Sequence, residues 1–344
     1  MFVDRIERRW IEAFKSTFEL SSVKPEETVI ILSETQSRPV NVHLAELALQ
    51  ELGLKPIHLQ VPTPPQTAPV PVRSTGACQA LGHNPAIMAA CAASSLVIDC
   101  TAEGLLHAPE LPKILKSGPR VIMVSNEHPD ALERTVPTLD LKTRAREDIA
   151  RLKAAKTMTV ESEAGTDLTV DIKDMPCAGV WGFTDRPGTV THWPAGVVVG
   201  FPKKNCVNGR LVMDAGDANL TFKRYLDAPV EMTIENDFVV KIDGKGTDAE
   251  LMKRYYEAWN DKNAYAVSHV GWGINERARF EALTFYDQNQ TNGTEIRASA
   301  GNFLFSTGAN EFVGRFTEGH FDLPMKGCTI KLDGVAVVEE GKLI

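Results

Sequence analysis

The stretch TVIILS (residues 28–33) is a short, continuous run of β-branched and aliphatic residues between polar ends. Such a run is typical of a strand buried on both faces, as in a parallel sheet. Residues 42–52 follow with apolar side chains at helical spacing and end at Gly53, and PIHLQV (residues 56–61) is the next predicted strand. Together these segments predict a strand–helix–strand unit.

The same alternation continues along the chain. Helices are predicted at 85–93 and 109–116, and each precedes an apolar strand, at 96–100 and at 120–124. Four apolar strands that alternate with helices predict a doubly wound α/β fold with a parallel sheet. The first strand is not followed by the glycine-rich pattern that binds dinucleotides, so that function is not indicated.

The pattern changes after a charged helix predicted at 138–155. Short strands separated by Gly, Asp, Asn and Pro follow, with one helix at 248–260. The strands are predicted at 157–160, 168–172, 197–201, 211–213, 230–234 and 238–242. This spacing predicts an antiparallel, β-rich α+β region. We therefore expect a doubly wound domain over residues 1–155 and a β-rich domain over residues 156–344.

Composition excludes several classes of protein. The 344 residues are 43% hydrophobic and 24% charged, which is ordinary for a globular enzyme. A net charge of −8 without a Lys/Arg-rich run argues against nucleic-acid binding. The first twenty residues are too charged for a signal peptide, and no stretch is long and apolar enough to span a bilayer. We expect a cytoplasmic protein whose six scattered cysteines are mostly buried thiols.

Two segments are expected to offer subunit contacts. Residues 62–71 contain five prolines, which favours an extended, semi-rigid loop. Residues 4–19 have the stripe of an amphipathic helix, formed by Ile6, Trp10, Phe14 and Phe18. An exposed Ile6/Trp10 face and the proline-rich loop indicate a homo-oligomer.

His320 and Asp322 lie two residues apart in GHFDLP (residues 319–324). In an extended segment, residues i and i+2 point to the same face, so the imidazole and the carboxylate are expected to lie side by side. His269 is the most economical third ligand, and two histidines with one carboxylate form the facial triad of non-haem Fe(II) sites. Taken alone, a His-x-Asp pair is more often two polar residues of a surface strand.

Two further histidines have informative surroundings. His107 directly follows the third predicted strand, where the ligand crevice of a doubly wound sheet lies, although a solvent-exposed turn is the alternative. His192 stands beside Trp193 in a loop with two prolines and two glycines, which is typical of a pocket edge or of a packed structural loop. The other histidines are expected to be structural or solvated, apart from His269 and His320: they are His43, His58, His83 and His128.

Hydroxyl groups and an amide follow an apolar strand in residues 302–310, where they are expected to bind a small polar ring or to form an ordinary turn. This segment completes a set of motifs that resembles the 2,5-dihydroxypyridine 5,6-dioxygenase family. The motifs are LLHAPE (105–110), HWP (192–194), SHVGWG (268–273), GNFLFSTG (301–308) and GHFDLP (319–324). They occur in the same order as in the family and extend over most of the chain.

The resemblance implies an aminopeptidase T-like fold whose second domain binds the metal. It implies Fe(II) held by His269, His320 and Asp322, with O₂ as co-substrate. The ring of 2,5-dihydroxypyridine, a small aromatic N-heterocycle from nicotinate or nicotine breakdown, would open between C5 and C6 to give N-formylmaleamate.

The chemistry of ring opening needs a base and contacts to the ring, and for these roles we name four further residues as a hypothesis. His107 or His192 is the candidate base for the ring hydroxyl, and Leu106 and Ser306 are the candidate ring contacts. Two alternatives stay open. One is a metallopeptidase of the aminopeptidase T type, which would need a Glu base and a metal-bound water. The other is a binding protein without enzymatic activity on the same scaffold.

Overall fold

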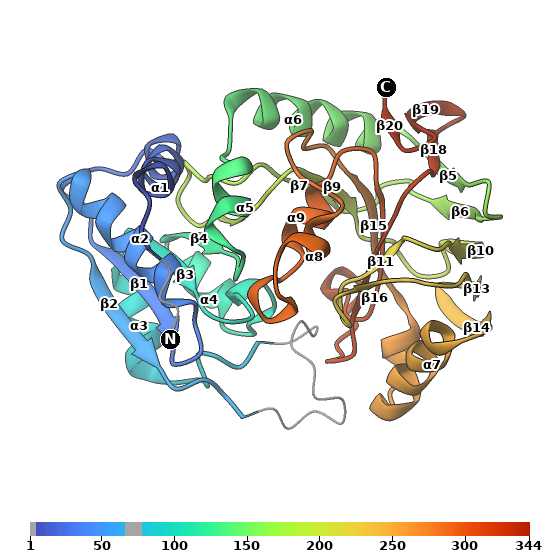
Figure 1. Cartoon of the computed structure of the whole chain (residues 1–344), viewed down its shortest axis with the longest axis horizontal. Helices are drawn as coiled ribbons and strands as arrows, with labels where there is room; N and C mark the ends of the chain where they lie inside the picture. Colours follow the sequence, from blue (N-terminus) through green and yellow to red (C-terminus); the bar gives the residue numbers. More distant parts are fainter. Residues whose placement is uncertain (1–4, 66–77) are drawn as a thin grey trace.

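The computed structural model describes residues 5–65 and 78–344. Most of the predicted proline-rich loop, residues 66–71, lies outside the described part. Figure 1 shows a parallel sheet, β1 to β4, on one side of the molecule and the strands β5, β6, β10, β13 and β14 on the other. The predicted combination of a parallel sheet and a largely antiparallel β region is confirmed.

The first sheet has five parallel strands in the order β2-β1-β3-β4-β8. In this order the strands are Ile57–Val61, Val29–Glu34, Leu96–Cys100, Arg120–Val124 and Val190–Trp193. The assignment of residues 190–193 to a loop was wrong. The run is only four residues long and is followed by a proline, so its local signal is weak, and pairing with β4 makes it a strand.

Helices lie on both faces of this sheet. Val29 and Ile31 pack in one apolar cluster with α1 (Arg8–Leu20) and α2 (Pro39–Glu51). The next residues of β1 point to the opposite face, where they pack with α3 (Pro85–Ala93) and α4 (Leu111–Lys116). A further short helix, α5 (Pro129–Arg134), packs beside α1.

The expectation that Trp10 lies on an exposed face of the first helix is wrong. Its side chain is buried at 7% exposure, its ring lies edge-on against His128, and its Nε1 donates to Asp130 at 2.9 Å. Ile6 is exposed, but it precedes α1. The stripe of apolar residues therefore docks this helix on its own chain and leaves only Ile6 for a subunit contact.

Two antiparallel sheets form the second half of the chain. The larger has the order β14-β13-β10-β6-β5-β18-β19-β20, and the smaller has the order β17-β16-β15-β9-β7. The larger comprises Phe238–Gly244, Val230–Glu235, Val207–Met213, Asp167–Asp171, Thr157–Glu161, Thr329–Leu332, Val335–Glu339 and Lys342–Leu343. The smaller comprises Phe321–Met325, Phe303–Thr307, Val267–Gly273, Val197–Gly200 and Cys177–Val180.

One apolar core fills the space between these two sheets. It contains Val160 of β5 together with Trp272, Phe305 and Phe321 of β15, β16 and β17. The helices α6 (Leu139–Ala154) and α7 (Thr247–Trp259) add further buried side chains to it. A two-stranded ribbon, Ala218–Asn219 with Arg224–Tyr225, and two short helices, α8 (Ala282–Phe285) and α9 (Thr294–Ala298), complete the arrangement. The domain boundary between residues 155 and 156 stays a prediction. Strand β8 comes after this boundary in the sequence but pairs with β4 of the first sheet.

The six cysteines are all unpaired thiols, and four of them are buried, as expected. Within residues 5–65 and 78–344, none of the helices is long and apolar enough to cross a membrane.

Candidate metal centre

Three neighbouring strands of the smaller sheet place the predicted ligands in a row. His269 on β15 pairs with Ser306 on β16, and Ser306 pairs with Asp322 on β17. Residues that pair directly across antiparallel strands point to the same face of the sheet. A register shift between Val267 and His269 sets which residues of β15 face this row. The pairing thus brings together residues that are 53 positions apart along the chain.

The three predicted metal ligands converge at this row. The ligand atoms of His269, His320 and Asp322 lie within 4.8 Å of one another. The Nε2 of His269 lies 3.6 Å from Oδ1 of Asp322, and the Nε2 of His320 lies 3.3 Å from Oδ2. Two ligands at right angles, each about 2.1 Å from a metal, would be about 3 Å apart, so these separations fit a shared ion.

The backbone of His320 is held from the opposite side. The hydroxyl of Tyr255 accepts a hydrogen bond from the His320 N–H at 2.8 Å and donates one to its carbonyl at 2.6 Å. The hydroxyl of Thr221 also donates to this carbonyl, at 3.0 Å. These contacts fix the start of β17 without using the imidazole, which stays available for a metal.

Both oxygens of the Asp322 carboxylate have a hydrogen-bond donor from the protein. Arg297 donates from Nε to Oδ2 at 2.6 Å, and the hydroxyl of Ser306 donates to Oδ1. Burial alone would raise the pKa of Asp322, but the Arg297 guanidinium and the two histidines hold it well below its usual range. The carboxylate is therefore ionised, and each oxygen retains a lone pair for a metal.

The residues present fit a divalent transition metal. Burial lowers the pKa of His269 to about 4, so its imidazole is neutral near pH 7, which is the form that binds metals. Within the described chain, the Nδ1 atoms of His269 and His320 are buried and have no hydrogen-bond partner. Two imidazoles and one carboxylate are the donor set of a facial triad.

His107 lies beside the centre, at the carboxyl end of β3. It ends a short 3₁₀ turn, Leu105–His107, and its ring lies 5.5 Å from that of His320. The Asp99 carboxylate accepts hydrogen bonds from the N–H of Thr101 at 3.0 Å and of Leu105 at 2.6 Å, which fixes this turn. Burial and the nearby His320 lower the pKa of His107 to about 3.

His192 approaches the same centre from β8. Its Nδ1 lies 2.7 Å from the carbonyl oxygen of Pro194, which follows a cis peptide bond. A carbonyl oxygen only accepts hydrogen bonds, so Nδ1 carries the hydrogen and Nε2 keeps its lone pair. Burial lowers the pKa of His192 to about 4, and the opposite charges of Arg297 and Asp322 also act on it.

The two predicted ring contacts differ in their surroundings. Ser306 is fully buried, and its hydroxyl donates a hydrogen bond to Asp322, so it orients this carboxylate. Leu106 adjoins His107 in the same turn, and 43% of its surface is exposed.

The structure does not bring the other four histidines to this centre. His58 binds the hydroxyl of Ser33, and Nδ1 of His83 lies 2.7 Å from Oε1 of Glu110. His128 stacks on Tyr286, and His43 is exposed on α2. Each matches the expected structural or solvated role.

Two residues of the centre were missed in the sequence. Asp99 had a signal, since a carboxylate inside an apolar strand must find buried donors. Arg297 had none, because it lies in TEIRA (residues 294–298), outside every motif recognised in the chain.

Comparison with known proteins gives concordant matches. The family model described as 2,5-dihydroxypyridine 5,6-dioxygenase matches residues 9–344. The 2,5-dihydroxypyridine 5,6-dioxygenase of Pseudomonas putida KT2440 is 36% identical over 337 residues, which cover 97% of this chain and 95% of that protein. A solved structure of 2,5-dihydroxypyridine dioxygenase from the same organism superposes with a TM-score of 0.92 at 35% identity, over 97% of this chain and 96% of that one.

A more distant structure is similar in fold. AmpT from Thermus thermophilus has a TM-score of 0.66 at 14% identity, over 98% of this chain and 99% of that one. At this identity the likeness concerns the fold alone, and the predicted aminopeptidase T-like fold agrees with it.

Proposed function

The chain belongs to the 2,5-dihydroxypyridine 5,6-dioxygenase family and is a ring-cleaving dioxygenase, and from this premise we propose how its own residues serve the reaction. It opens 2,5-dihydroxypyridine between C5 and C6 with O₂. The product is N-formylmaleamate, so both oxygen atoms enter the opened ring. The aminopeptidase alternative is not favoured, because the family match extends over nearly the whole chain.

We propose that His269, His320 and Asp322 hold the metal and that this metal is Fe(II). Two imidazoles, of which that of His269 is neutral at pH 7, and one ionised carboxylate lie within 4.8 Å of one another and support this assignment. When bound, Fe(II) would supply open coordination positions and the redox chemistry that O₂ requires. Ser306 and Arg297 hold the carboxylate from its two oxygens.

His107 and His192 are the proposed proton acceptors for the 5-hydroxyl group of the ring. Both are neutral at pH 7, because burial lowers the pKa of His107 to about 3 and that of His192 to about 4. The hydrogen bond to Pro194 leaves Nε2 of His192 able to accept a proton. His107 is held beside the metal ligands by the turn that Asp99 fixes. Either histidine is thus in the unprotonated form that a general base needs.

Leu106 and Ser306 are the proposed contacts to the ring. Leu106 would offer an apolar surface next to His107, and its partial exposure leaves that surface open to a ligand. Ser306 lies between His269 and Asp322 in the row of paired residues, so a ring at the metal would meet its side chain. Its present hydrogen bond to Asp322 supports a second role in orienting the carboxylate.

Location and assembly are also proposals. The six unpaired thiols support a reducing, cytoplasmic location. A homo-oligomer stays a prediction.

The convergence of the three ligands beside His107 carries this proposal. Purified protein would be freed of metal, reloaded anaerobically with Fe(II) or Zn(II), and mixed with 2,5-dihydroxypyridine and O₂. We expect O₂ uptake only after Fe(II) loading, at one O₂ per ring opened. Equal turnover with Zn(II), or no uptake with Fe(II), would overturn the assignment of the metal.

A further inference from the structure

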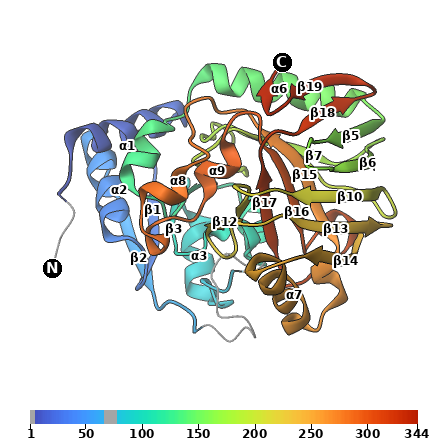
Figure 2. The same cartoon turned by 45° about the vertical axis from the view of Figure 1, so that its right-hand side comes forward.

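The short helix α9 stands between the two halves of the chain. Figures 1 and 2 both show it between the parallel sheet with its helices and the strands of the metal centre. It has only five residues, Thr294–Ala298, and a helix of this length is not stable by itself because nucleation is unfavourable. Its position therefore depends on the contacts that its side chains make.

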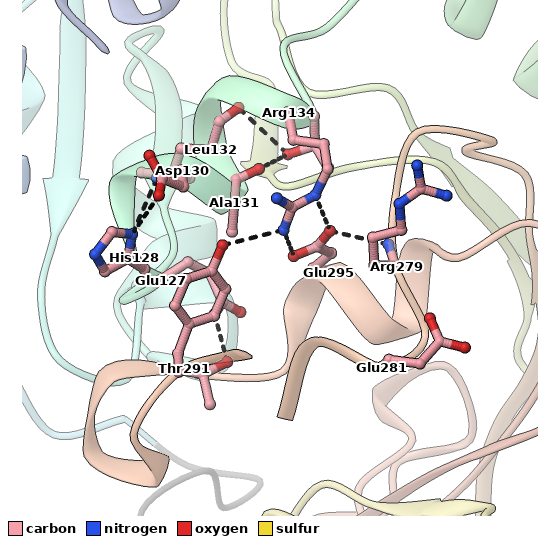
Figure 3. Close-up of polar contacts among 12 residues, drawn as sticks. Glu127, His128, Asp130, Ala131, Leu132, Arg134, Arg279, Glu281, Thr291 and Glu295 are labelled. Carbon is pink, nitrogen blue, oxygen red and sulfur yellow. Dashed lines mark hydrogen bonds and ion pairs between the residues drawn. The ribbon is translucent and has the colours of Figure 1, made fainter. Parts of the chain in front are cut away.

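One side chain of α9 anchors it to α5. Glu295 is fully buried, and it receives two hydrogen bonds of 2.8 Å from Nε and Nη2 of Arg134. The backbone N–H of Arg279 donates to the same carboxylate at 2.9 Å, as Figure 3 shows. A bidentate Arg–carboxylate pair fixes both distance and direction, and here it joins α9 to the first half of the chain.

A second carboxylate holds the beginning of α9. Glu127, which precedes α5, is buried and accepts hydrogen bonds from the N–H of Thr294 at 2.7 Å and from the hydroxyl of Thr291 at 2.6 Å. Burial raises the pKa of Glu127, while these donors act in the opposite direction. Two buried glutamates thus fix α9, one at its first residue and one at its second.

The last link leads from α9 to the metal centre. Arg297 donates from Nε to Asp322 at 2.6 Å and from Nη1 to the hydroxyl of Thr294 at 3.4 Å. A continuous series of hydrogen bonds therefore runs from Glu127 through Thr294 and Arg297 to the metal carboxylate. Burying a charged pair such as Arg297 and Asp322 costs desolvation free energy. The attraction between the two charges offsets this cost only if their geometry is precise.

We propose that Arg297 is a positioning residue for Asp322, and that Glu127 and Glu295 hold Arg297 in place through α9. The inference rests on the proposed role of Asp322 as a metal ligand. If it is correct, contacts at the interface between the two halves of the chain contribute to the affinity for the metal. Removing a group that orients a metal ligand typically weakens metal binding by about 10–100-fold.

The test measures metal binding directly. Equilibrium dialysis gives the dissociation constant for Co(II), and the visible absorption of bound Co(II) reports the ligand geometry. We expect Arg297→Met to weaken binding by about 10–100-fold and to change the spectrum. Arg297→Lys keeps the charge but lacks the planar fork, so it should recover part of the affinity. The matched control is Arg144→Met, which removes an arginine that pairs with Glu276 at the surface, and it should bind Co(II) as the wild type does.

Comparing single and double variants distinguishes a positioning role of Arg297 from a general effect on stability. Glu295→Gln should weaken Co(II) binding by itself, and the double variant with Arg297→Met should be no weaker than Arg297→Met alone. A wild-type dissociation constant and spectrum in folded Arg297→Met, Arg297→Lys and Glu295→Gln would overturn the inference, whatever their melting temperatures. Asp322→Ala is measured alongside. If it also binds Co(II) normally, the proposed metal site itself fails, whereas a loss confined to Asp322→Ala refutes only the role of Arg297.

Discussion

Ser306 lies opposite Asp322 across β16 and β17, and its hydroxyl donates a hydrogen bond to Oδ1 of that carboxylate. The next residue on β16, Thr307, points to the other face and binds the hydroxyl of Tyr256 at 2.9 Å. Two adjacent buried hydroxyls therefore serve different purposes, one at the metal centre and one in the core.

This contrast gives a matched pair of variants. Ser306→Ala should weaken metal binding by about tenfold or more, because Asp322 loses the donor that orients one oxygen. Thr307→Val removes a buried hydrogen bond of similar kind and should cost about 1–3 kcal/mol of stability with unchanged metal affinity. Metal titration and thermal unfolding of both variants check this. Equal metal affinities in the two would refute the orienting role of Ser306.

His320→Ala should abolish Fe(II) binding while the fold survives. The backbone of His320 keeps its contacts with Tyr255 and Thr221 in this variant, so β17 still begins in the same place. Iron content after reconstitution and far-UV circular dichroism measure the two effects. His43→Ala, which removes an exposed imidazole on α2, is the control and should keep full iron content. Stoichiometric iron in His320→Ala would exclude this residue as a ligand.

His107→Ala and His192→Gln should both retain iron, and one of them should lose rate. General base catalysis contributes about 10²–10⁴-fold, so the variant that removes the base should lower kcat within this range. The other variant should change KM more than kcat, because it removes only a contact beside the ring. Steady-state kinetics with iron content measured on the same samples distinguish the two. Wild-type kcat values in both variants would remove these histidines from proton transfer.

The buried histidines also predict how the metal-free protein responds to acid. Burial lowers the pKa of His192 from 6.5 to about 4 and that of His107 to about 3. Between pH 6.5 and 4 the unfolded chain binds protons that the folded chain does not, so the free energy of unfolding falls as the pH falls. Urea titrations of metal-free protein should show this slope, and it should be shallower in His192→Gln. The same slope in this variant as in the wild type would show that His192 is not buried in its neutral form.

The parallel sheet was predictable because its first four strands alternate with helices along the chain. Three of them are apolar runs, whereas the edge strand β2, IHLQV, is mostly exposed. The fifth strand was not predictable, because Val190–Trp193 is short and becomes a strand only through its pairing with β4. The exposure of Trp10 was predicted wrongly, although the helix itself was predicted. An apolar stripe shows that a helix packs against the rest of the protein, but it does not show which residues of the stripe become buried.

The cluster of His269, His320 and Asp322 was predictable for a different reason. His320 and Asp322 are close along the chain, and their spacing has a direct meaning in a strand. His269 was the most economical third residue of the triad, but its register with Ser306 depends on a bulge in β15 that the sequence does not show. Arg297 depends entirely on tertiary structure, because only the packing of α9 against two distant segments brings its guanidinium to Asp322.

The most direct test of the central claim is oxygen labelling. Fe(II)-loaded protein would be mixed with 2,5-dihydroxypyridine under ¹⁸O₂, and the product would be analysed by mass spectrometry. The account predicts N-formylmaleamate in which both added oxygen atoms are ¹⁸O. Incorporation of a single labelled atom, or an unopened ring after O₂ exposure, would contradict it.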